Sequence, residues 1–479
     1  MKLKAALLSF LLFTATIFTA VLPGASTKAV EANRTVIDSR LTKELLSAAG
    51  PVEVLITFKH GEGVSSHDLN LLRSAGITAG IGLKSLPIAG ALATKSQIEK
   101  LAQNDEILSI YINKKLQYDN AAATDLTGVD KVRTHDTMRK MNGGLPVSGK
   151  GIGVVINDSG VDGTHKDLQY GSHLVQNVLG STNLHAIDTL LPITYVEGIP
   201  NTDNNSGHGT HVAGIVGGTG AMSGGKYEGV APGAKLIGYG SGAGLAMLDT
   251  LGGFDYALTH QKMYNIRVIT NSWGDTSDAG TDFDPFNPIN LATKKLYDRG
   301  IVTVFSAGNS GPEASTISGN YKKAPWIVAV AAGDKSGKLA DFSSRGVKGK
   351  GGTVSVDGES WTWEDRPTVT SPGVDIISTR VLSPIPLLGA TDDAQYIELG
   401  HLPYYTTMSG TSMAAPHVAG IIALMLEANP LLSPKEIKEI LQTTATPMAG
   451  HEAWEVGAGY VNAYKSVDLA FKKRTALKR

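Results

Sequence analysis

Four polar residues spread along the chain carry the side chains needed for nucleophilic attack on a carbonyl group. They are Asp158 in VVINDSGVD, His208 in GHGTHVAG, Asn309 in FSAGNSGP and Ser412 in GTSMAAPHVAG. A serine hydroxyl needs a base to take its proton, a group that orients the base, and a donor that stabilises the oxyanion. A histidine, a carboxylate and an amide can fill these roles. The set predicts acyl-transfer chemistry if the fold brings the four side chains together.

Most of these residues also have a simpler structural interpretation. Ser412 opens the apolar run 413–426, which is typical of a buried helix, and a serine there often caps the helix. Asp158 and Asn309 each follow a predicted strand, where both residue types are common in turns. Taken singly, these three residues fit the structural interpretation better. The combination of all four favours a catalytic site.

A metal site is an alternative for the histidine motif, because His208 and His211 are three residues apart. Zinc, however, needs a third and usually a fourth ligand, and the chain has neither cysteine nor an HExxH pattern. A buried core histidine is the simpler interpretation of His211. His208 stands between Gly207 and Gly209 at an expected helix start, where its side chain can face a cleft.

The elements that must position these residues follow an α/β pattern. Short apolar runs without strict alternation are typical of strands covered on both faces. We expect such strands at 151–158, 234–240, 268–273, 301–308, 326–333 and 374–379, with helices at 248–263 and 287–300 between them. This order predicts a doubly wound, mostly parallel sheet, in which sites form at the carboxyl ends of the strands.

A smaller unit precedes this domain, at about residues 52–116. Its patterns predict a split βαβ, ferredoxin-like α+β fold in the order β-α-β-β-α-β. The expected strands are 52–58, 77–85, 88–94 and 107–118, and the expected helices are 67–76 and 95–105. The polar stretch DNAAATDLTG (119–128) is expected to be an exposed linker and a cleavage site.

Residues 1–29 have the pattern of a secretory signal peptide. A basic start, MKLK, is followed by an apolar stretch and then by small residues where a peptidase can cut. An uncleaved membrane anchor is the alternative, but the small-residue exit favours cleavage. We therefore expect an extracellular protein with no stable membrane span.

Composition limits the possible partners. The 479 residues are 42% hydrophobic and 18% charged, with a formal net charge of −1, so neither nucleic acid nor an anionic membrane is expected to bind. The absence of cysteine excludes disulfides, thiolate metal sites and a cysteine nucleophile.

From about residue 125 to 468 the chain resembles the subtilisin-like serine proteases, or subtilases. The resemblance is carried by VVINDSGVD, GHGTHVAG, NSWG, SAGNSG and GTSMAAPHVAG, and by the order Asp, His, Ser, which is that of subtilisin. The small unit resembles a subtilisin-type inhibitory propeptide. The resemblance implies a signal peptide at 1–29, a propeptide at 30–120 and a peptidase domain at 121–479.

The resemblance also implies a role for each residue. Ser412 would be the nucleophile, His208 the general base and acid, and Asp158 the group that orients the imidazole. Asn309 and the backbone N–H of Ser412 would stabilise the oxyanion. The protein would be a secreted monomeric serine endopeptidase, made as a self-processing zymogen, with no cofactor required for the chemistry.

Peptide and protein substrates would bind as an added β-strand. By similarity, Ser272, Trp273 and Gly274 would form one edge of the groove, and Gly240, Ser241 and Gly242 the opposite edge. Trp273 is alternatively a packed core aromatic. The propeptide would act as an intramolecular inhibitor, and self-cleavage is expected between Leu116 and Leu126.

Two features depart from the family pattern. Typical subtilisins carry an Asn-rich calcium loop where this chain has GGTGAMSGGKYEGVAP (217–232), which has few oxygen side chains. The usual calcium site is therefore not matched, and structural calcium elsewhere stays open. Long insertions at 347–367 and 381–405 either wall the cleft or form surface hairpins.

Three rival interpretations are less consistent with the motifs. A catalytically silent, peptide-binding relative would not need all four chemical positions filled. An α/β-hydrolase would show G-x-S-x-G and the order Ser, Asp, His. The Ser-Glu-Asp acid peptidases share a GTS motif but would not need His208, and a near-neutral to alkaline optimum would distinguish them.

Overall fold

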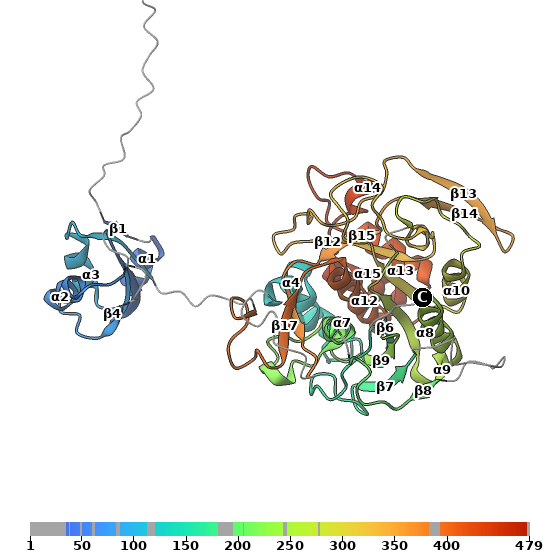
Figure 1. Cartoon of the computed structure of the whole chain (residues 1–479), viewed down its shortest axis with the longest axis horizontal. Helices are drawn as coiled ribbons and strands as arrows, with labels where there is room; N and C mark the ends of the chain where they lie inside the picture. The colour runs from blue at the N-terminus through green and yellow to red at the C-terminus, as the bar shows by residue number, and fades with distance from the viewer. Residues whose placement is uncertain are drawn as a thin grey trace, which may run out of the picture. The chain divides into compact units, whose positions relative to one another are not determined.

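The structure is a computed structural model of the whole chain. It describes residues 35–37, 39–47, 50–59, 63–82, 87–112, 120–180, 195–204, 206–242, 247–275, 278–382 and 393–476. The predicted signal peptide lies outside the described residues. The chain divides after Leu116 into two compact units, which are described separately (Figure 1).

The first unit is a small α+β fold built on a sheet of order β1-β5-β2-β4-β3. Its elements are β1 (Val36–Ile37), α1 (Ser39–Ser47), β2 (Val52–Phe58), α2 (Ser66–Ser74), β3 (Gly80–Gly82), β4 (Ile88–Ala93), α3 (Lys95–Ala102) and β5 (Ile107–Ile112). Alternate residues of β2, namely Val54, Ile56 and Phe58, are buried in its core. The predicted βαββαβ elements are present, with β1 and α1 added before them.

The expectation of an exposed linker at 119–128 is wrong for residues 120–127, which form helix α4 (Asn120–Thr127). Ala123 and Thr127 are buried, and the Thr127 hydroxyl shares a hydrogen bond of 2.9 Å with Nε2 of His417. The stretch contains alanines and a leucine, which favour a helix once a packing surface is available. Polar composition alone did not indicate that surface.

The second unit is built on an eight-stranded sheet of order β15-β12-β11-β10-β6-β9-β7-β8. All neighbouring pairs are parallel except β7 and β8, which are antiparallel. The strands are β6 (Gly153–Asp158), β7 (Leu174–Leu179), β8 (Val196–Glu197), β9 (Lys235–Gly240), β10 (Ile266–Asn271), β11 (Val302–Ser306), β12 (Val328–Gly333) and β15 (Val369–Pro372). The predicted α/β architecture is confirmed.

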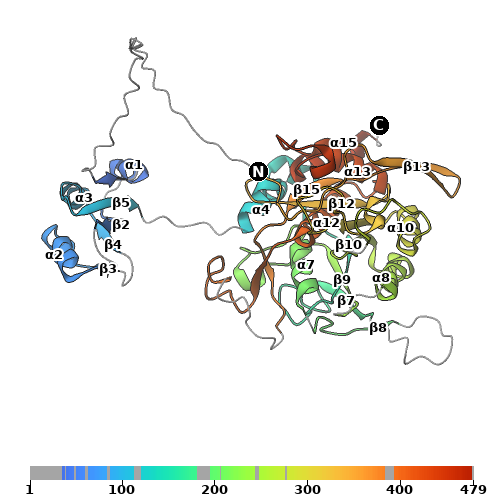
Figure 2. The same ribbon diagram turned by 45° about the horizontal axis from the view of Figure 1, so that its top comes forward.

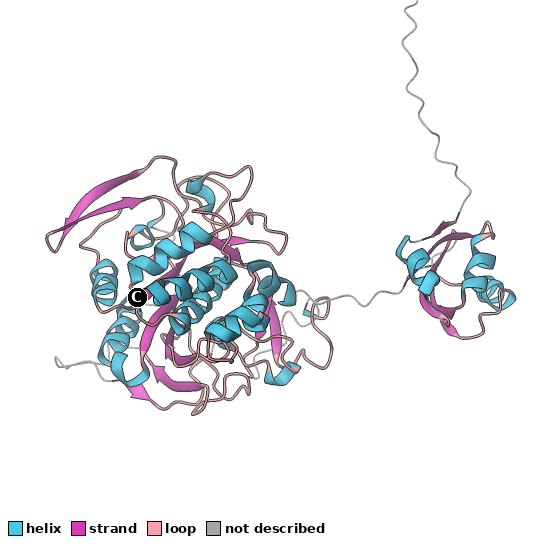
Figure 3. Cartoon of the chain, turned by 180° about the vertical axis from the view of Figure 1, so that it is seen from behind, coloured by secondary structure: helices cyan, strands magenta, loops and turns pink. Residues whose placement is uncertain are grey.

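Helices cover both faces of this sheet, as Figures 2 and 3 show. On one face lie α7 (His208–Gly217) and α12 (Thr411–Ala428), and on the other α8 (Met247–Thr259) and α10 (Pro288–Asp298). The remaining helices are α5 (Val129–Thr134), α6 (Asp136–Met141), α9 (Gln261–Tyr264), α13 (Pro434–Thr444), α14 (Ala453–Val456) and α15 (Ala463–Ala476), with 3₁₀ turns η2 (Ala221–Ser223) and η4 (Asn320–Lys323). Among the described helices, α12 is long and apolar enough to span a membrane, but 89% of it is buried inside this unit.

Three segments differ from, or add to, the prediction. The strand expected at 374–379 is β16 (Ile376–Thr379), which pairs antiparallel with β17 (Tyr405–Met408) outside the main sheet. The insertion at 347–367 contains the hairpin β13 (Gly351–Val356) and β14 (Glu359–Glu364), which extends from the edge of the unit (Figure 1). Part of the insertion at 381–405 is described, and its Asp393, Ile397 and Tyr405 are buried.

Candidate active site

Asp158 and His208 meet at the carboxyl edge of the sheet. Asp158 is the last residue of β6 and His208 the first residue of α7. Nδ1 of His208 lies 2.6 Å from Oδ1 of Asp158, whose side chain is 2% exposed, whereas the imidazole is 30% exposed. A carboxylate held at Nδ1 fixes the tautomer that keeps Nε2 available to take a proton.

The start of α7 depends on two glycines. Gly207 has a φ of 74°, in the left-handed region that favours glycine. A Cβ on Gly209 would clash with the carbonyl oxygen of Gly160 and lie 3.1 Å from Cβ of Asp158. The motif GHGTH therefore brings the helix close enough to β6 for the histidine to reach the aspartate.

A second carboxylate, that of Asp203, supports this helix start and was missed by the sequence analysis. Its fully buried side chain accepts hydrogen bonds from Gly207 N (3.1 Å), Thr210 N (3.0 Å), Thr210 Oγ1 (2.6 Å) and Ser159 Oγ (3.2 Å). Ser159 Oγ in turn accepts from Gly209 N at 2.9 Å. The only sequence signal was an acidic residue a few positions before the histidine motif, which is typical of helix starts.

The electrostatics favour the protonated form of His208. Burial by itself would lower the pKa of the imidazole, but the charge and hydrogen bond of Asp158, with a contribution from Asp203, outweigh it and raise the pKa above 6.5. An imidazole whose charged form is stabilised in this way is a stronger base for a serine hydroxyl.

Ser412 lies in the first turn of α12 and does not cap it, so the capping interpretation is wrong. The N-cap position is Gly410, and Ser412 is the second residue of the helix. Its hydroxyl donates a hydrogen bond of 3.2 Å to the carbonyl oxygen of Ser272, and Ser272 Oγ donates one of 2.8 Å to the carbonyl oxygen of Ser412. Ser272 directly follows β10, the strand next to β6, so this pair holds Ser412 at the edge that carries Asp158. Among the described contacts, the Ser412 hydroxyl bonds to Ser272 rather than to His208.

Asn309 is exposed beside Ser412, and its amide has a defined orientation. Oδ1 accepts from Thr411 N at 2.9 Å and from Thr411 Oγ1 at 2.8 Å. A backbone N–H can only donate, so the other end of the amide must be the donor Nδ2. A Cβ on Gly410 would lie 3.2 Å from Nδ2 of Asn309 and 3.6 Å from N of Ser412. The two predicted oxyanion donors, Asn309 Nδ2 and Ser412 N, therefore both lie near the position that a side chain on Gly410 would occupy.

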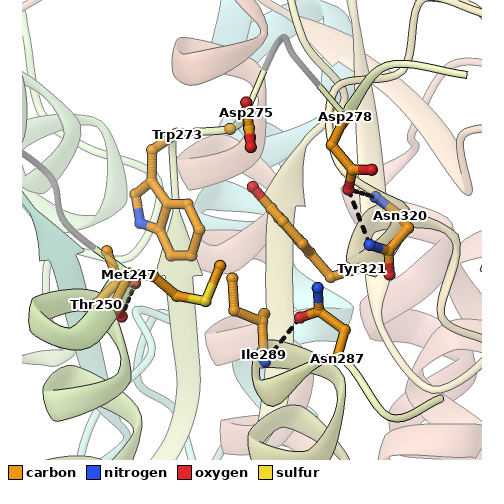
Figure 4. Close-up of a pocket in the computed structure, with 10 residues that line it drawn as sticks. Met247, Thr250, Trp273, Asp275, Asp278, Asn287, Ile289, Asn320 and Tyr321 are labelled. Atoms are coloured by element: carbon orange, nitrogen blue, oxygen red, sulfur yellow. Dashed lines mark hydrogen bonds between the residues drawn. The ribbon is translucent and has the colours of Figure 1, made fainter. Parts of the chain in front are cut away.

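The two predicted groove edges follow β9 and β10, the strands on either side of β6 in the sheet. Gly240, Ser241 and Gly242 stand at and after the end of β9, and Ser241 N donates to the carbonyl oxygen of Asp158 at 2.9 Å. Across β6, a cavity of about 530 Å³ borders Trp273 and Gly274 (Figure 4). It is lined by Met247, Thr250, Trp273, Gly274, Asp275, Asp278, Asn287, Ile289, Asn320 and Tyr321.

Trp273 is packed against other aromatic rings and also borders the cavity. Its indole N–H donates to the carbonyl oxygen of Asn157 at 2.9 Å, and its ring contacts Phe305 with the centroids 5.2 Å apart. The ring is also part of the cavity wall, beside Tyr321, as Figure 4 shows. Trp273 is thus a packed aromatic that presents one side to the cavity.

The interpretation of His211 as a core residue is confirmed. It is fully buried, Nε2 lies 3.0 Å from the carbonyl oxygen of Ile376, and burial lowers its pKa to about 3. Within the described part of the chain, no group of three or more His, Asp or Glu side chains is arranged to hold a metal ion.

The segment that replaces the calcium loop is held by protein groups. Oδ1 of Asp167 accepts from Met222 N at 2.9 Å, and its Oδ2 accepts from the hydroxyl of Tyr405 at 2.7 Å. Glu228 pairs with Arg133 at 2.8 Å. These carboxylates are engaged by hydrogen bonds and an ion pair.

Comparisons with known proteins place the chain in a family. The profile of the subtilase family of peptidases (Peptidase_S8) matches residues 149–461. The chain is 31% identical to the serine protease AprX of Bacillus subtilis (strain 168), over 77% of this chain and 76% of that protein. It is 29% identical to subtilisin BL of Lederbergia lenta, over 66% and 91%. The solved structure of sphericase is similar with a TM-score of 0.51 and 26% identity, covering 70% of this chain and 97% of that one.

A parallel α/β sheet with an Asp–His pair and a serine at its carboxyl edge defines a serine hydrolase. The chain belongs to the subtilase family, whose profile covers most of the second unit. It is accordingly a subtilisin-like serine endopeptidase, and the family needs no cofactor for its chemistry.

Proposed function

We propose that this protein is a secreted endopeptidase in which Ser412, His208 and Asp158 form the catalytic triad. The observation that carries the proposal is the 2.6 Å contact between His208 Nδ1 and Asp158 Oδ1 at the sheet edge, next to a serine held in the first turn of α12. The helix N-terminus adds a positive end of a dipole beside the nucleophile.

In the proposed reaction, Ser412 Oγ attacks the peptide carbonyl carbon as its proton passes to Nε2 of His208. The hydrogen bond from Ser412 Oγ to the carbonyl oxygen of Ser272 must break first, and rotation of the Ser412 side chain toward His208 breaks it. His208 then gives the proton to the leaving amine, and water hydrolyses the acyl-enzyme by the same route in reverse. Asp158 stays ionised and stabilises the imidazolium.

Asn309 Nδ2 and the N–H of Ser412 would hold the oxyanion. The support for this role is that Thr411 engages Oδ1 and so fixes the donor end before the substrate arrives. Fixed donors stabilise developing charge without having to reorganise.

The substrate would lie as an extended strand between 272–274 and 240–242. Main-chain pairing with these edges recognises any peptide sequence, whereas the cavity beside Trp273 and Gly274 would receive one substrate side chain. Ser241 Oγ is buried without a hydrogen-bond partner among the described side chains, so the 240–242 edge would act through its backbone.

We further propose that residues 1–29 direct export, that residues 30–120 are an inhibitory propeptide and that residues 121–479 are the mature peptidase. The separate core of the first unit supports its being a domain in its own right. Because α4 begins at Asn120 and Thr127 is buried, cleavage is best placed in the early part of the 116–126 window. Export is also consistent with the absence of cysteine.

The test is the intact mass of purified precursor, with the wild type compared with Ser412→Ala after refolding without other proteases. The proposal expects the wild type to lose its first unit and the variant to stay whole. Ser409→Ala, which removes an exposed hydroxyl three residues earlier, is the matched control and should still process. Equal cleavage of wild type and Ser412→Ala would show that Ser412 is not the nucleophile.

If neither precursor is cleaved, a denatured-casein assay on residues 121–479, folded with the first unit supplied separately, decides the question. Turnover that disappears in Ser412→Ala supports the triad, with maturation performed by another protease. No turnover in the wild type would contradict the proposed function.

A further inference from the structure

Lys322, the third residue of η4, is a buried lysine that the proposed mechanism does not use. Its side chain is 1% exposed. Two other buried lysines pair with carboxylates, Lys294 with Asp298 at 2.7 Å and Lys323 with Asp365 at 3.0 Å. In the part of the chain that the structure describes, the hydrogen bond of Lys322 Nζ runs instead to a neutral hydroxyl, Ser318 Oγ, at 3.0 Å.

An ammonium group buried without a counter-ion is costly, so its position requires an explanation. Burial lowers the pKa of Lys322 to about 7, so both forms of the amine are present near neutrality. Perturbed groups of this kind gather at functional sites, although packing alone also produces them. The geometry around the amine decides between these two explanations.

The amine lies between the two segments that hold the reacting groups. A Cβ on Gly274 would clash with Lys322 Nζ and would lie 2.6 Å from Ser318 Oγ. A Cβ on Gly308 would lie 2.7 Å from the same Ser318 oxygen. Gly274 comes two residues after Ser272, which holds Ser412, and Gly308 directly precedes Asn309. Ser318 therefore packs against both glycines, and Lys322 Nζ packs against Gly274.

The two segments also border the acyl side of the bond to be cleaved. The attacked carbonyl carbon must come within about 3–3.5 Å of Ser412 Oγ, with its oxygen toward Asn309 Nδ2. The residue that carries this carbonyl is then flanked by 272–274 on one side and 308–309 on the other. Both segments have glycine at the points that pack against Ser318 and Lys322, so neither glycine places a side chain between the substrate residue and the amine.

We propose that Lys322 makes the enzyme prefer peptide bonds that follow a glutamate or aspartate, by pairing its ammonium group with the carboxylate of that residue. This inference rests on the proposed function, because it takes Ser412 and Asn309 as the reacting groups. The lysine is a specificity-determining residue, and Ser318 positions its amine. The pair would form in a water-poor site, where a charged hydrogen bond contributes more than it does at the surface.

The neighbouring elements hold the amine in place. Asn320, two residues before Lys322, donates from both N and Nδ2 to Asp278 Oδ2, each at 2.8 Å. Tyr321 is buried against Trp273 and Phe305. A cation fixed by its surroundings loses little conformational freedom when it binds, which favours discrimination between substrates.

The test uses peptidyl 4-nitroanilides that differ only in the residue before the scissile bond, Glu or Gln, and the enzyme matured from the full chain. These side chains have nearly the same shape and differ in charge. We expect the wild type to favour Glu over Gln by about tenfold or more in kcat/KM, the size of one charged hydrogen bond. A ratio near one in the wild type would overturn the inference, and this measurement needs no variant.

Lys322→Met keeps the length of the side chain and removes its charge. We expect the Glu to Gln ratio to fall by about tenfold, with cleavage after Gln retained. Lys438→Met is the matched control, because Lys438 is also a lysine held by an internal contact, from Nζ to the carbonyl oxygen of Pro325 at 2.8 Å, and its ratio should stay at the wild-type value. An unchanged ratio in Lys322→Met would contradict the assignment.

Ser412→Ala distinguishes a failure of the proposed function from a failure of the specificity assignment. If Ser412→Ala stays whole while the wild type matures with a Glu to Gln ratio near one, the triad stands and the specificity assignment fails. If Ser412→Ala still cleaves both peptides at the wild-type rate, the proposed function fails, and the inference about Lys322 fails with it.

Discussion

At the scale of single residues, the site depends on atoms that are fixed before any substrate binds. Asn309 is exposed, yet Thr411 holds its amide oxygen from two directions, through a backbone N–H and a hydroxyl. Thr411 Oγ1 also accepts from Gly308 N at 3.0 Å. One threonine thus links the segment that carries the proposed oxyanion donor to the helix that carries the proposed nucleophile.

Asn309→Ala should lower kcat by about 10²–10³-fold with a small change in KM, because the donor acts mainly on the transition state. This magnitude is the one that loss of the corresponding donor causes in subtilisin. Steady-state kinetics on one peptide substrate measure both constants. Ser310→Ala, next to Asn309 and also exposed, should behave like the wild type. A loss confined to KM would remove Asn309 from the oxyanion site.

The pH dependence of activity tests the Asp158–His208 contact. Because the base must be neutral, kcat/KM should rise with pH through the pKa of His208, which Asp158 raises above 6.5. In Asp158→Asn the charge that raises this pKa is gone, so the rising limb should move to lower pH. The kcat of Asp158→Asn should also be about 10⁴-fold lower than that of the wild type, as for the related change in the trypsin triad.

The measurement is the kcat/KM profile of both enzymes between pH 5 and 10. Asp136→Asn, which removes an exposed carboxylate of α6, is the control and should leave the limb in place. A limb that stays at the same pH in Asp158→Asn would contradict the proposed pairing.

At the scale of elements, the proposed catalytic groups come from the ends of strands and the starts of helices. β6 supplies Asp158, and α7 and α12 supply His208 and Ser412. The start of α7 depends on Asp203, since its carboxylate satisfies backbone N–H groups that the helix itself leaves unpaired.

Asp203→Ala should destabilise the second unit by roughly 2–4 kcal/mol, because buried donors lose their acceptor. The measurement is urea unfolding of the full chain in a Ser412→Ala background, which avoids self-digestion. Asn204→Ala, at the exposed neighbouring position, is the matched control and should change stability by less than about 0.5 kcal/mol. Equal midpoints for the two variants would show that Asp203 is not needed at the start of α7.

The packing of α7 and α12 also predicts sensitivity to acid. Burial lowers the pKa of His211 and of His417 to about 3, so between about pH 6.5 and pH 3 the unfolded chain binds these protons and the folded chain does not. Stability must then decrease as pH falls, by about 1.4 kcal/mol per pH unit for each histidine. His417→Gln should reduce the slope of the unfolding free energy against pH by about 1.4 kcal/mol per pH unit, measured from pH 7 to pH 4. An unchanged slope would exclude His417 as a source.

Sequence patterns predicted the elements better than they predicted the contacts between them. The apolar runs located β6, β9, β10, β11 and β12, because strands buried on both faces leave a strong signal. They placed 374–379 in the main sheet, although β16 pairs only with β17, because periodicity does not specify the partner of a strand. The roles of Asp203 and Thr411 depend on residues distant in sequence, and residue type alone does not indicate them.

At the scale of the whole molecule, the chain joins two units with separate cores. The first is small and encloses Leu41, Ile56 and Ile110 within one cluster. The second contains long-range parallel pairing between all neighbouring strands of its main sheet except β7 and β8, and such topologies fold slowly because distant segments must meet first. The second unit is large and mostly parallel, and a small unit precedes it in the chain. This arrangement fits a role in which the first unit assists the folding of the second.

If the first unit is a propeptide, residues 121–479 refolded alone should recover little activity, and adding residues 30–116 as a separate chain should increase the recovery several-fold. The physical reason is kinetic, because a partner that binds the partly folded second unit stabilises it before the long-range contacts are complete. The measurement is peptide hydrolysis after dilution from denaturant, with and without the added unit. Ile56→Asp in the added unit, which places a charge in its core, should abolish the assistance, whereas Glu44→Gln at an exposed position should not. Equal recovery without the first unit would leave it no role in folding, and its function would then have to be sought in inhibition alone.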